Sequence, residues 1–502
     1  MKTILPFLLL ISGLALGQPT TQALRDLSDE KLKPAILELK EFVALPNDAL
    51  YPNDIKKNIE WLEGAFRERN FSTQILPTSR TPLFFAEKKS PQASSTILFY
   101  MHFDGQSVDP SKWDQDSPWE SVLKKAVGES WEEIPWSNLE GQVSDDWRMF
   151  GRSTSDDKGP IVMLLQAMDI LSENKLTPSI NIKVILDGEE EKGSQHLPAA
   201  VEQYKEILSA DHLIINDGPM HLTGEPTLIF GCRGITRVDL TVYGPKKHQH
   251  SGHYGNYAPN PAFRLSRLLS SMKDENGRVI IDGYYDGIEF NESTKQVMVG
   301  VPDNPDQIHQ TLGIAKPEQV GANLQESLQF PSLNVRGLSS GWVGNEARTI
   351  VPSEATAAID VRLVPESEPE RLKELIRNHI EKQGYYVINR DPTPEERLAK
   401  PKIAKLTSGG NTLPFRTAIN SPTGKWLAKA MMFGWEKEPV KIRIMGGTVP
   451  IATFINQLNI PAVVVPLVNP DNNQHSPNEN LRLGNIKSGI RTFLSIMLNA
   501  PN

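Results

Sequence analysis

Apolar residues follow two alternating patterns along the first half of the chain. In residues 54–68 they recur at helical spacing, which predicts an amphipathic helix. The unbroken apolar run that ends the segment 95–100 predicts a strand buried on both faces. A helix at 161–171 and strands at 182–186 and 213–215 repeat these patterns. Strands that alternate with helices favour a mostly parallel sheet with helices on both faces.

The pattern changes after Gly234. Apolar and polar residues alternate in 238–242, which is typical of a sheet with one face in solvent. Two helices and two further strands are predicted next, at 262–272, 355–364, 372–380 and 385–388. This order is close to a split βαβ layer, as in ferredoxin-like folds.

The first pattern returns from about Leu406, with a predicted strand at 462–468 and a closing helix at 486–497. We therefore predict one α/β domain, made of residues 18–233 and 396–502, that is interrupted by a smaller α+β domain at 234–395. The segment 274–335 has little periodicity and yields no predicted element.

Composition narrows the class of protein. The 502 residues allow roughly two to four domains, and 39% hydrophobic with 23% charged residues describes a globular chain. The 53 basic residues are outnumbered by 61 acidic ones and form no block, which argues against a nucleic-acid partner. The single cysteine, Cys232, excludes an internal disulfide and a cysteine-based zinc site.

The amino terminus has the pattern of an export signal. One cation, Lys2, precedes an apolar run of about 13 residues, which is shorter than the ~20 residues of a membrane-spanning helix. Small residues follow at Ala15 and Gly17. We predict a signal peptide at 1–17 and a secreted or periplasmic mature protein without a membrane anchor; a buried amino-terminal helix is the alternative.

Acidic residues and histidines collect where the predicted strands end. The clusters are His102 with Asp104, Asp156 with Asp157, 187–191, 216–217 and His475. Each alone has an ordinary structural explanation, such as an acidic helix start. Ligands in open α/β sheets, however, bind beyond the carboxyl ends of strands. So many carboxylates at one edge would repel one another without a cation, and oxygen and imidazole ligands suit zinc or manganese.

These segments resemble the co-catalytic-metal peptidase family that includes carnosinase-type dipeptidases, aminoacylases and succinyl-diaminopimelate desuccinylase. The matches, in the family's order, are 100–106 (YMHFDGQ), 108–113 (VDPSKW), 151–159 (GRSTSDDKG), 187–194 (DGEEEKGS), 216–217 (ND), 250–252 (HSG), 362–365 (RLVP), 446–448 (GGT) and 475–476 (HS). They span nearly the whole mature chain. The resemblance implies a zinc exopeptidase-like catalytic domain and a lid domain that forms a homodimer.

The resemblance also implies two divalent metal ions per subunit, Zn²⁺ first and Mn²⁺ or Co²⁺ as alternatives. Asp156 would bridge them, and the peptide bond after it would be cis. The other ligands would be His102 and Asp217 at one site, and Glu191 and His475 at the other. Asp104 would fix the tautomer of His102.

The implied reaction is hydrolysis of a peptide bond in dipeptides or short peptides. A hydroxide bridging the two metals would attack, with Glu190 as general base. His250, from the second subunit, would stabilise the oxyanion. Arg362 would pair with the substrate's terminal carboxylate. Backbone amides of three further residues would assist it: Gly446, Gly447 and Thr448.

Three positions depart from the family pattern. Ser153 and Asn256 stand where glycines are common, and Met445 stands where carnosinase-type chains often carry an acid that binds the substrate's amino group. The segment 113–147 holds five of the nine tryptophans, which either pack into the core or narrow the pocket.

Three other functions are alternatives to a dipeptidase. An N-acyl amino-acid amidohydrolase would use the same metals with a different pocket. A binding protein without turnover is disfavoured because every ligand and the base are present. A di-metal phosphoesterase is disfavoured because the sequence shows no second basic cluster for a phosphoryl group.

Overall fold

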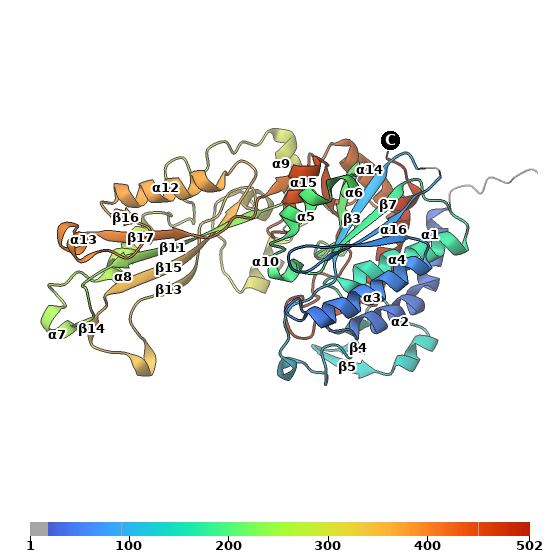
Figure 1. The fold of residues 1–502 in the computed structure, drawn as a ribbon, viewed down its shortest axis with the longest axis horizontal. Helices are drawn as coiled ribbons and strands as arrows, with labels where there is room; N and C mark the ends of the chain where they lie inside the picture. Colours follow the sequence, from blue (N-terminus) through green and yellow to red (C-terminus); the bar gives the residue numbers. More distant parts are fainter. Residues whose placement is uncertain (1–18, 92, 450, 502) are drawn as a thin grey trace, which may run out of the picture.

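The computed structural model describes residues 19–91, 93–449 and 451–501, so the predicted signal peptide lies outside the described residues. The chain forms two lobes (Figure 1). The larger lobe contains the two ends of the described chain, and the smaller lobe contains its middle. No helix in the described ranges combines the length and the apolar character that crossing a bilayer would require.

An eight-stranded sheet forms the centre of the larger lobe. Its strands, in spatial order, are β1 (Ser72–Leu76), β2 (Leu83–Lys88), β7 (Asn181–Asp187), β3 (Thr96–His102), β8 (His212–Ile215), β20 (Ala462–Val464), β9 (Thr227–Ile229) and β19 (Val440–Ile442). The four central strands, β7 to β20, pair in parallel, so the mainly parallel sheet is confirmed. β20 ends four residues before the predicted 468, because Pro466 has no N–H to continue a ladder.

Helices cover both faces of this sheet. On β3, Ile97, Phe99 and Met101 belong to one apolar cluster, whereas Leu98 and Tyr100 belong to another. The first cluster includes helices α1 (Thr21–Glu30), α2 (Leu32–Val43), α3 (Pro52–Glu68), α4 (Lys158–Glu173), α14 (Pro422–Trp435) and α16 (Leu483–Leu498). The second includes α5 (Leu197–Gln203), α6 (Lys205–Leu208) and α15 (Ala452–Leu458). Burial on both faces explains the unbroken apolar run in this strand.

The smaller lobe contains a five-stranded sheet. Its spatial order is β13 (Asn334–Ser339), β15 (Glu354–Leu363), β11 (Gly234–Tyr243), β17 (Ile403–Ser408) and β16 (Tyr386–Ile388). Helices α8 (Pro261–Ser270) and α12 (Pro369–Lys382) bury one face, and burial alternates along β15, as a sheet with one solvent face requires. β17 lies after the predicted boundary at 395 yet pairs with β11, so this sheet extends to Ser408.

The chain passes between the lobes twice, at a two-stranded ribbon. β10 (Gly231–Cys232) connects β9 of the large sheet to β11 of the small one. β18 (Phe415–Arg416) follows β17 on the way back to α14 and pairs antiparallel with β10. This ribbon belongs to neither of the larger sheets.

The segment without predicted structure, 274–335, contains three short helices. They are α9 (Glu292–Val299), α10 (Pro305–Leu312) and α11 (Leu324–Ser327). Each begins after an asparagine, Asn291, Asn304 or Asn323, whose side chain accepts backbone N–H groups of the first turn. One or two turns are too short to establish a helical period, so the asparagine caps were the available signal.

The tryptophan-rich segment packs into a third sheet. β4 (Val122–Val127), β5 (Ser130–Ile134) and β6 (Arg148–Phe150) join β21 (Asn480–Arg482) in the order β21-β6-β4-β5. Trp131 lies edge-on to Phe150 at 5.2 Å between ring centroids, and the Arg148 guanidinium lies 4.6 Å from the Trp131 ring. β6 and β21 are antiparallel, and Phe150 lies opposite Asn480. The loop after β6 and the loop before β21 therefore lie at the same end of this sheet.

Two helical glycines, Gly159 in α4 and Gly64 in α3, differ in how closely other atoms surround them. A Cβ on Gly159, in the first turn, would lie 2.3 Å from the Thr154 carbonyl oxygen, whereas a Cβ on Gly64 in α3 would meet nothing within 4 Å. We expect Gly159→Ala to lower the free energy of unfolding by about 1–3 kcal/mol through overpacking. Gly64→Ala should raise it by roughly 0.4–1 kcal/mol, because alanine restricts the unfolded chain. Urea unfolding of the metal-free protein measures both; an unchanged Gly159→Ala variant would contradict the packing.

Candidate metal centre

Neighbouring parallel strands deliver three groups of polar side chains to one edge of the large sheet. His102 is the last residue of β3, and Asp217 is the second residue after β8. Glu190 and Glu191 begin a short 3-10 helix (Glu190–Lys192) after β7. Because β7, β3 and β8 are adjacent and parallel, their carboxyl ends converge.

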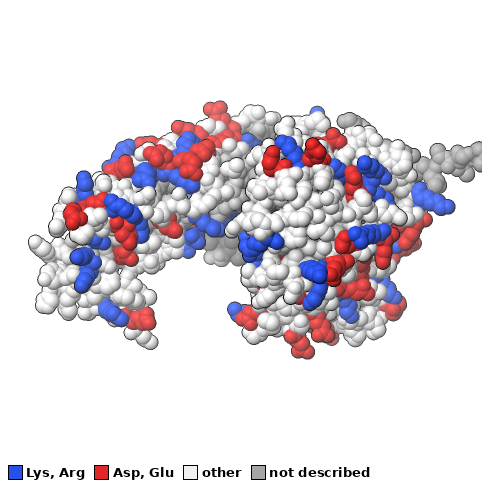
Figure 2. Space-filling view, in the orientation of Figure 1, with Lys and Arg blue, Asp and Glu red and all other residues white. Residues whose placement is uncertain are grey.

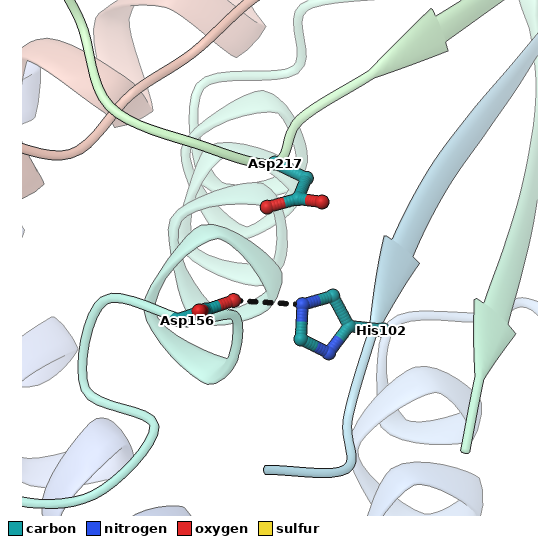
Figure 3. Close-up of side chains that lie close together, drawn as sticks. All are labelled: His102, Asp156 and Asp217. Atoms are coloured by element: carbon teal, nitrogen blue, oxygen red, sulfur yellow. Dashed lines mark hydrogen bonds and ion pairs between the residues drawn. The ribbon is translucent and has the colours of Figure 1, made fainter. Parts of the chain in front are cut away.

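Two loops complete the cluster, with Asp156 at its centre. His102 Nε2 lies 2.8 Å from Asp156 Oδ1, and the Asp217 carboxylate faces the same space (Figure 3). His475 Nε2 lies 3.1 Å from Asp156 Oδ2 and 3.3 Å from Glu191 Oε2. These residues form two ligand groups that share Asp156: one with His102 and Asp217, the other with Glu191 and His475. Within each group, the potential ligand atoms lie within 4.8 Å of one another. The structure thus brings together the five side chains that the sequence selected as ligands.

The cluster has the features of a site for cations. Asp156 Oδ2 is buried, and His475 Nε2 lies 3.1 Å from it. Burial and the Asp156 carboxylate raise the pKa of Glu191 to about 7. Burial also raises the pKa of Asp217 to about 6, although His102 opposes this shift. Two divalent ions would offset the repulsion among these carboxylates. A donor set of carboxylates and imidazoles without thiolates fits zinc or manganese.

Asp104 links His102 to the loop that carries the glutamates. Its carboxylate accepts the backbone N–H groups of Glu190 (3.0 Å) and Glu191 (3.1 Å), and its Oδ1 lies 3.4 Å from His102 Nδ1. Burial alone would lower the pKa of His102, but the Asp104 and Asp156 carboxylates raise it well above its ordinary value. The peptide bond between Asp156 and Asp157 is cis, as expected.

Glu190 lies beside the candidate ligands but belongs to neither ligand group. Burial raises the pKa of its carboxyl group well above the ordinary value; His102 opposes this shift, and Asp217 adds to it. A bound cation would favour the ionised form. An ionised carboxylate beside the two ligand groups is suited to accept a proton.

The residues expected to bind substrate fall into two places. Arg362, near the end of β15, donates from Nη1 to Thr448 Oγ1 at 2.7 Å, which joins the two lobes beside Gly446 and Gly447. His250 is exposed, and its Nδ1 accepts the Gly252 N–H at 3.1 Å. It immediately precedes α7 (Ser251–Tyr254), at the outer end of the smaller lobe and far from β3 (Figure 1). His250 therefore does not join the cluster of its own chain.

Two hydrogen bonds that support candidate ligands were not predicted from the sequence. Gln106 donates from Nε2 to Glu191 Oε2 at 2.6 Å, and Glu479 accepts the backbone N–H of Asp156 at 2.9 Å. Glu479 lies only four residues after His475, which was the one available signal.

Ser153 stands at a position whose backbone conformation favours the glycine that is common in the family. Its φ of 64° lies in the left-handed region that glycine adopts most readily. Its hydroxyl accepts a hydrogen bond from Asn47 Nδ2 at 3.0 Å and lies 2.4 Å from where a Cβ on Gly105 would be. The serine is accommodated because a glycine faces it.

Comparison with known proteins agrees with this site. The sequence profile described as Peptidase family M20/M25/M40 matches residues 98–499. The chain belongs to this family. A Cys-Gly metallodipeptidase of Schizosaccharomyces pombe is 26% identical over 93% of this M20/M25/M40 chain and 90% of its own length. A human Beta-Ala-His dipeptidase is 24% identical over 92% of this chain and 89% of its own.

Solved structures share the two-lobed fold. An M20 family metallo-carboxypeptidase from Sulfolobus solfataricus superposes with a TM-score of 0.74 at 26% identity, over 93% of this chain and 99% of its own. Human carnosine dipeptidase 1 superposes with a TM-score of 0.72 at 21% identity, over 96% of this chain and 99% of its own. The predicted class, a metal-dependent hydrolase of peptide bonds, is confirmed by the family and its metallodipeptidase members.

Metal affinity should depend on pH. Glu191 and Asp217 bind a cation only when ionised, and their carboxyl pKa values of about 7 and about 6 make protons compete. The nearby Asp156 and Glu191 carboxylates raise the pKa of His475 to about 9, which adds to this competition. We expect the affinity of the metal-free protein for Zn²⁺ to fall steadily from about pH 8 to pH 5. Calorimetric titration at each pH measures it.

His475→Ala serves as the control for this titration. It removes one member of one ligand group and leaves the other intact. At about pH 8 it should bind one equivalent fewer than the wild type. An affinity that is flat across the pH range would contradict ligation by these carboxylates.

Proposed function

We propose that the protein is a metal-dependent dipeptidase that acts on dipeptides or short peptides. The observation that carries this proposal is the pair of ligand groups that share Asp156, with Glu190 beside them, in an M20/M25/M40 peptidase. The metallodipeptidases among its relatives align over more than nine tenths of this chain. That length covers both lobes, so the resemblance extends beyond the metal ligands.

Glu190 is the proposed proton carrier. Bound divalent ions would polarise the scissile carbonyl and lower the pKa of water. Glu190 then takes a proton from the attacking water and returns it to the leaving amine, so that one carboxyl serves as base and then as acid. Asp104 supports this role because it accepts the Glu190 N–H and so holds the backbone at that position.

Arg362 is the proposed anchor for the terminal carboxylate of the substrate. A guanidinium has five donors in a planar fork, and the contact with Thr448 uses one of them. A Cβ on Gly446 or Gly447 would meet its nearest atom in ordinary contact, at 3.4 and 3.6 Å, respectively, so the absence of a side chain leaves room for a methyl-sized group beside each backbone. Such an anchor favours substrates that end close to the scissile bond.

The metal, the location and the assembly are also part of the proposal. The donor set favours Zn²⁺, with Mn²⁺ or Co²⁺ as alternatives. The sequence of residues 1–17 favours secretion or a periplasmic location. A homodimer through the smaller lobe is favoured by β13, an edge strand whose six residues are all exposed. In such a dimer, His250 of one chain would serve the partner's site.

The Glu190 assignment can be tested by substitution. We expect Glu190→Gln to keep both metal ions, because its side chain is in neither ligand group, and to lower kcat by roughly 100- to 10,000-fold. The measurement combines metal analysis with a panel of free dipeptides, N-acetylated dipeptides and N-acyl amino acids. Wild-type turnover of free dipeptides supports a dipeptidase; turnover of acyl amino acids alone would indicate the amidohydrolase. Full activity of Glu190→Gln would remove Glu190 from the mechanism.

Mixed dimers test the role of His250. We expect His250→Ala to be nearly inactive, because the variant lacks the imidazole that is proposed to stabilise the oxyanion in the partner's site. Mixing it with inactive Glu190→Gln should restore turnover at hybrid sites that combine one intact His250 with one intact Glu190. His248→Ala, two residues away, is the matched control and should retain activity. If exchanging heterodimers show no rescue, each site is served by its own chain.

A further inference from the structure

A buried ion pair lies behind the metal ligands. Arg152 donates from Nη1 to Glu479 Oε2 at 2.7 Å, and their side chains are 3% and 0% exposed. The Arg152 guanidinium also lies 5.3 Å from the centre of the Trp113 ring. Neither charged residue belongs to the two ligand groups, and the proposed reaction uses neither.

Glu479 binds the backbone of the loop that ends in Asp156. Its Oε2 accepts the Ser153 N–H at 2.9 Å. Its Oε1 accepts the N–H groups of Ser155 (3.0 Å) and Asp156 (2.9 Å) and the Ser155 hydroxyl (2.9 Å). With Arg152, this carboxylate receives five hydrogen bonds, four of which hold one short loop. Such a carboxylate sets the backbone of the loop and therefore the direction in which the Asp156 side chain leaves it.

Arg152 and the strand pair connect this loop to the loop of His475. Arg152 donates from Nη2 to the carbonyl of Ser476 at 3.2 Å, and the Gly151 N–H donates to the Glu479 carbonyl at 2.9 Å. The two loops leave the same end of the β6–β21 pair, where Phe150 faces Asn480. The guanidinium thus bridges the chain next to one ligand and the carboxylate that holds the other.

We propose that Glu479 and Arg152 are positioning residues that order the Asp156 and His475 loops together, in the geometry that both metal sites need. The inference rests on the proposed function, because it concerns the same ligands. The backbone is consistent with it: Ser153 and His475 have φ values of 64° and 62°. Non-glycine residues keep such conformations only where their surroundings hold them.

Metal affinity separates this role from a purely structural one. We expect Glu479→Gln to raise the Zn²⁺ dissociation constant about 10- to 100-fold, because its NH₂ group would face N–H donors and release the loop. Arg152→Lys keeps the charge but cannot bridge Glu479 and Ser476 as a planar fork, so we expect a smaller loss. Calorimetric titration of the metal-free variants measures both constants without any substrate.

Glu38→Gln is the matched control. Glu38, on α2, pairs with Arg69 at 2.9 Å, and both side chains are largely buried, away from the ligand groups. It makes the same chemical change and should leave the Zn²⁺ dissociation constant within about threefold of wild type. If Glu479→Gln folds and binds Zn²⁺ as wild type does, the proposal is wrong. If the wild type itself fails to bind two ions, the proposed function fails instead.

Amide hydrogen exchange on the metal-free wild type needs no variant. The N–H groups of Ser153, Ser155 and Asp156 are bonded to Glu479 rather than to a ligand, so they should be protected before metal is added. Exchange of all three at the rate of an unstructured peptide would overturn the proposal even if the variants fail to fold. Protection that appears only after Zn²⁺ is added would also overturn it, since the metal would then order the loop.

Discussion

The repulsion between carboxylates at one edge of the large sheet is the constraint around which the site is built. Asp156, Asp217 and Glu191 come from separate elements but lie within the reach of shared ions. Parallel strands make this arrangement possible, since β7, β3 and β8 all end at the same edge. Burial, with the Asp156 carboxylate adding to it, raises the pKa values of Glu191 and Asp217, and cations would offset the cost of ionising both groups.

Two carboxylates that belong to neither ligand group hold the backbone of the loops that carry the ligands. Asp104 accepts the N–H groups of Glu190 and Glu191, and Glu479 accepts that of Asp156 and two of its neighbours. These two carboxylates do not compete for the same donors, so each loop has its own anchor. A site held in this way has little freedom to separate its ligands in response to their repulsion.

The sequence predicted those parts of the fold and of the candidate site that depend on local sequence patterns. The run around Phe99 indicated a strand buried on both faces, and both apolar clusters meet on β3. The five candidate ligands were predicted because strand ends and family motifs coincided, and the structure brings these side chains together. The partner of β17 was not predictable, since antiparallel pairing with β11 leaves no mark on the period of either strand. Short helices such as α10, and the contacts of Glu479, depend on caps and tertiary contacts that a periodic pattern does not contain.

The narrow ribbon of β10 and β18 has a mechanical consequence. In the part of the chain that the structure describes, these two short strands carry the chain between the lobes, and the hydrogen bond from Arg362 to Thr448 crosses from one lobe to the other. β11 leads out of the ribbon and pairs Ile235 with Arg362, so this arginine lies opposite a residue only three positions after the end of β10. A swing of the lobes about this pivot would carry the distant His250 through a wide arc and leave the arginine almost stationary.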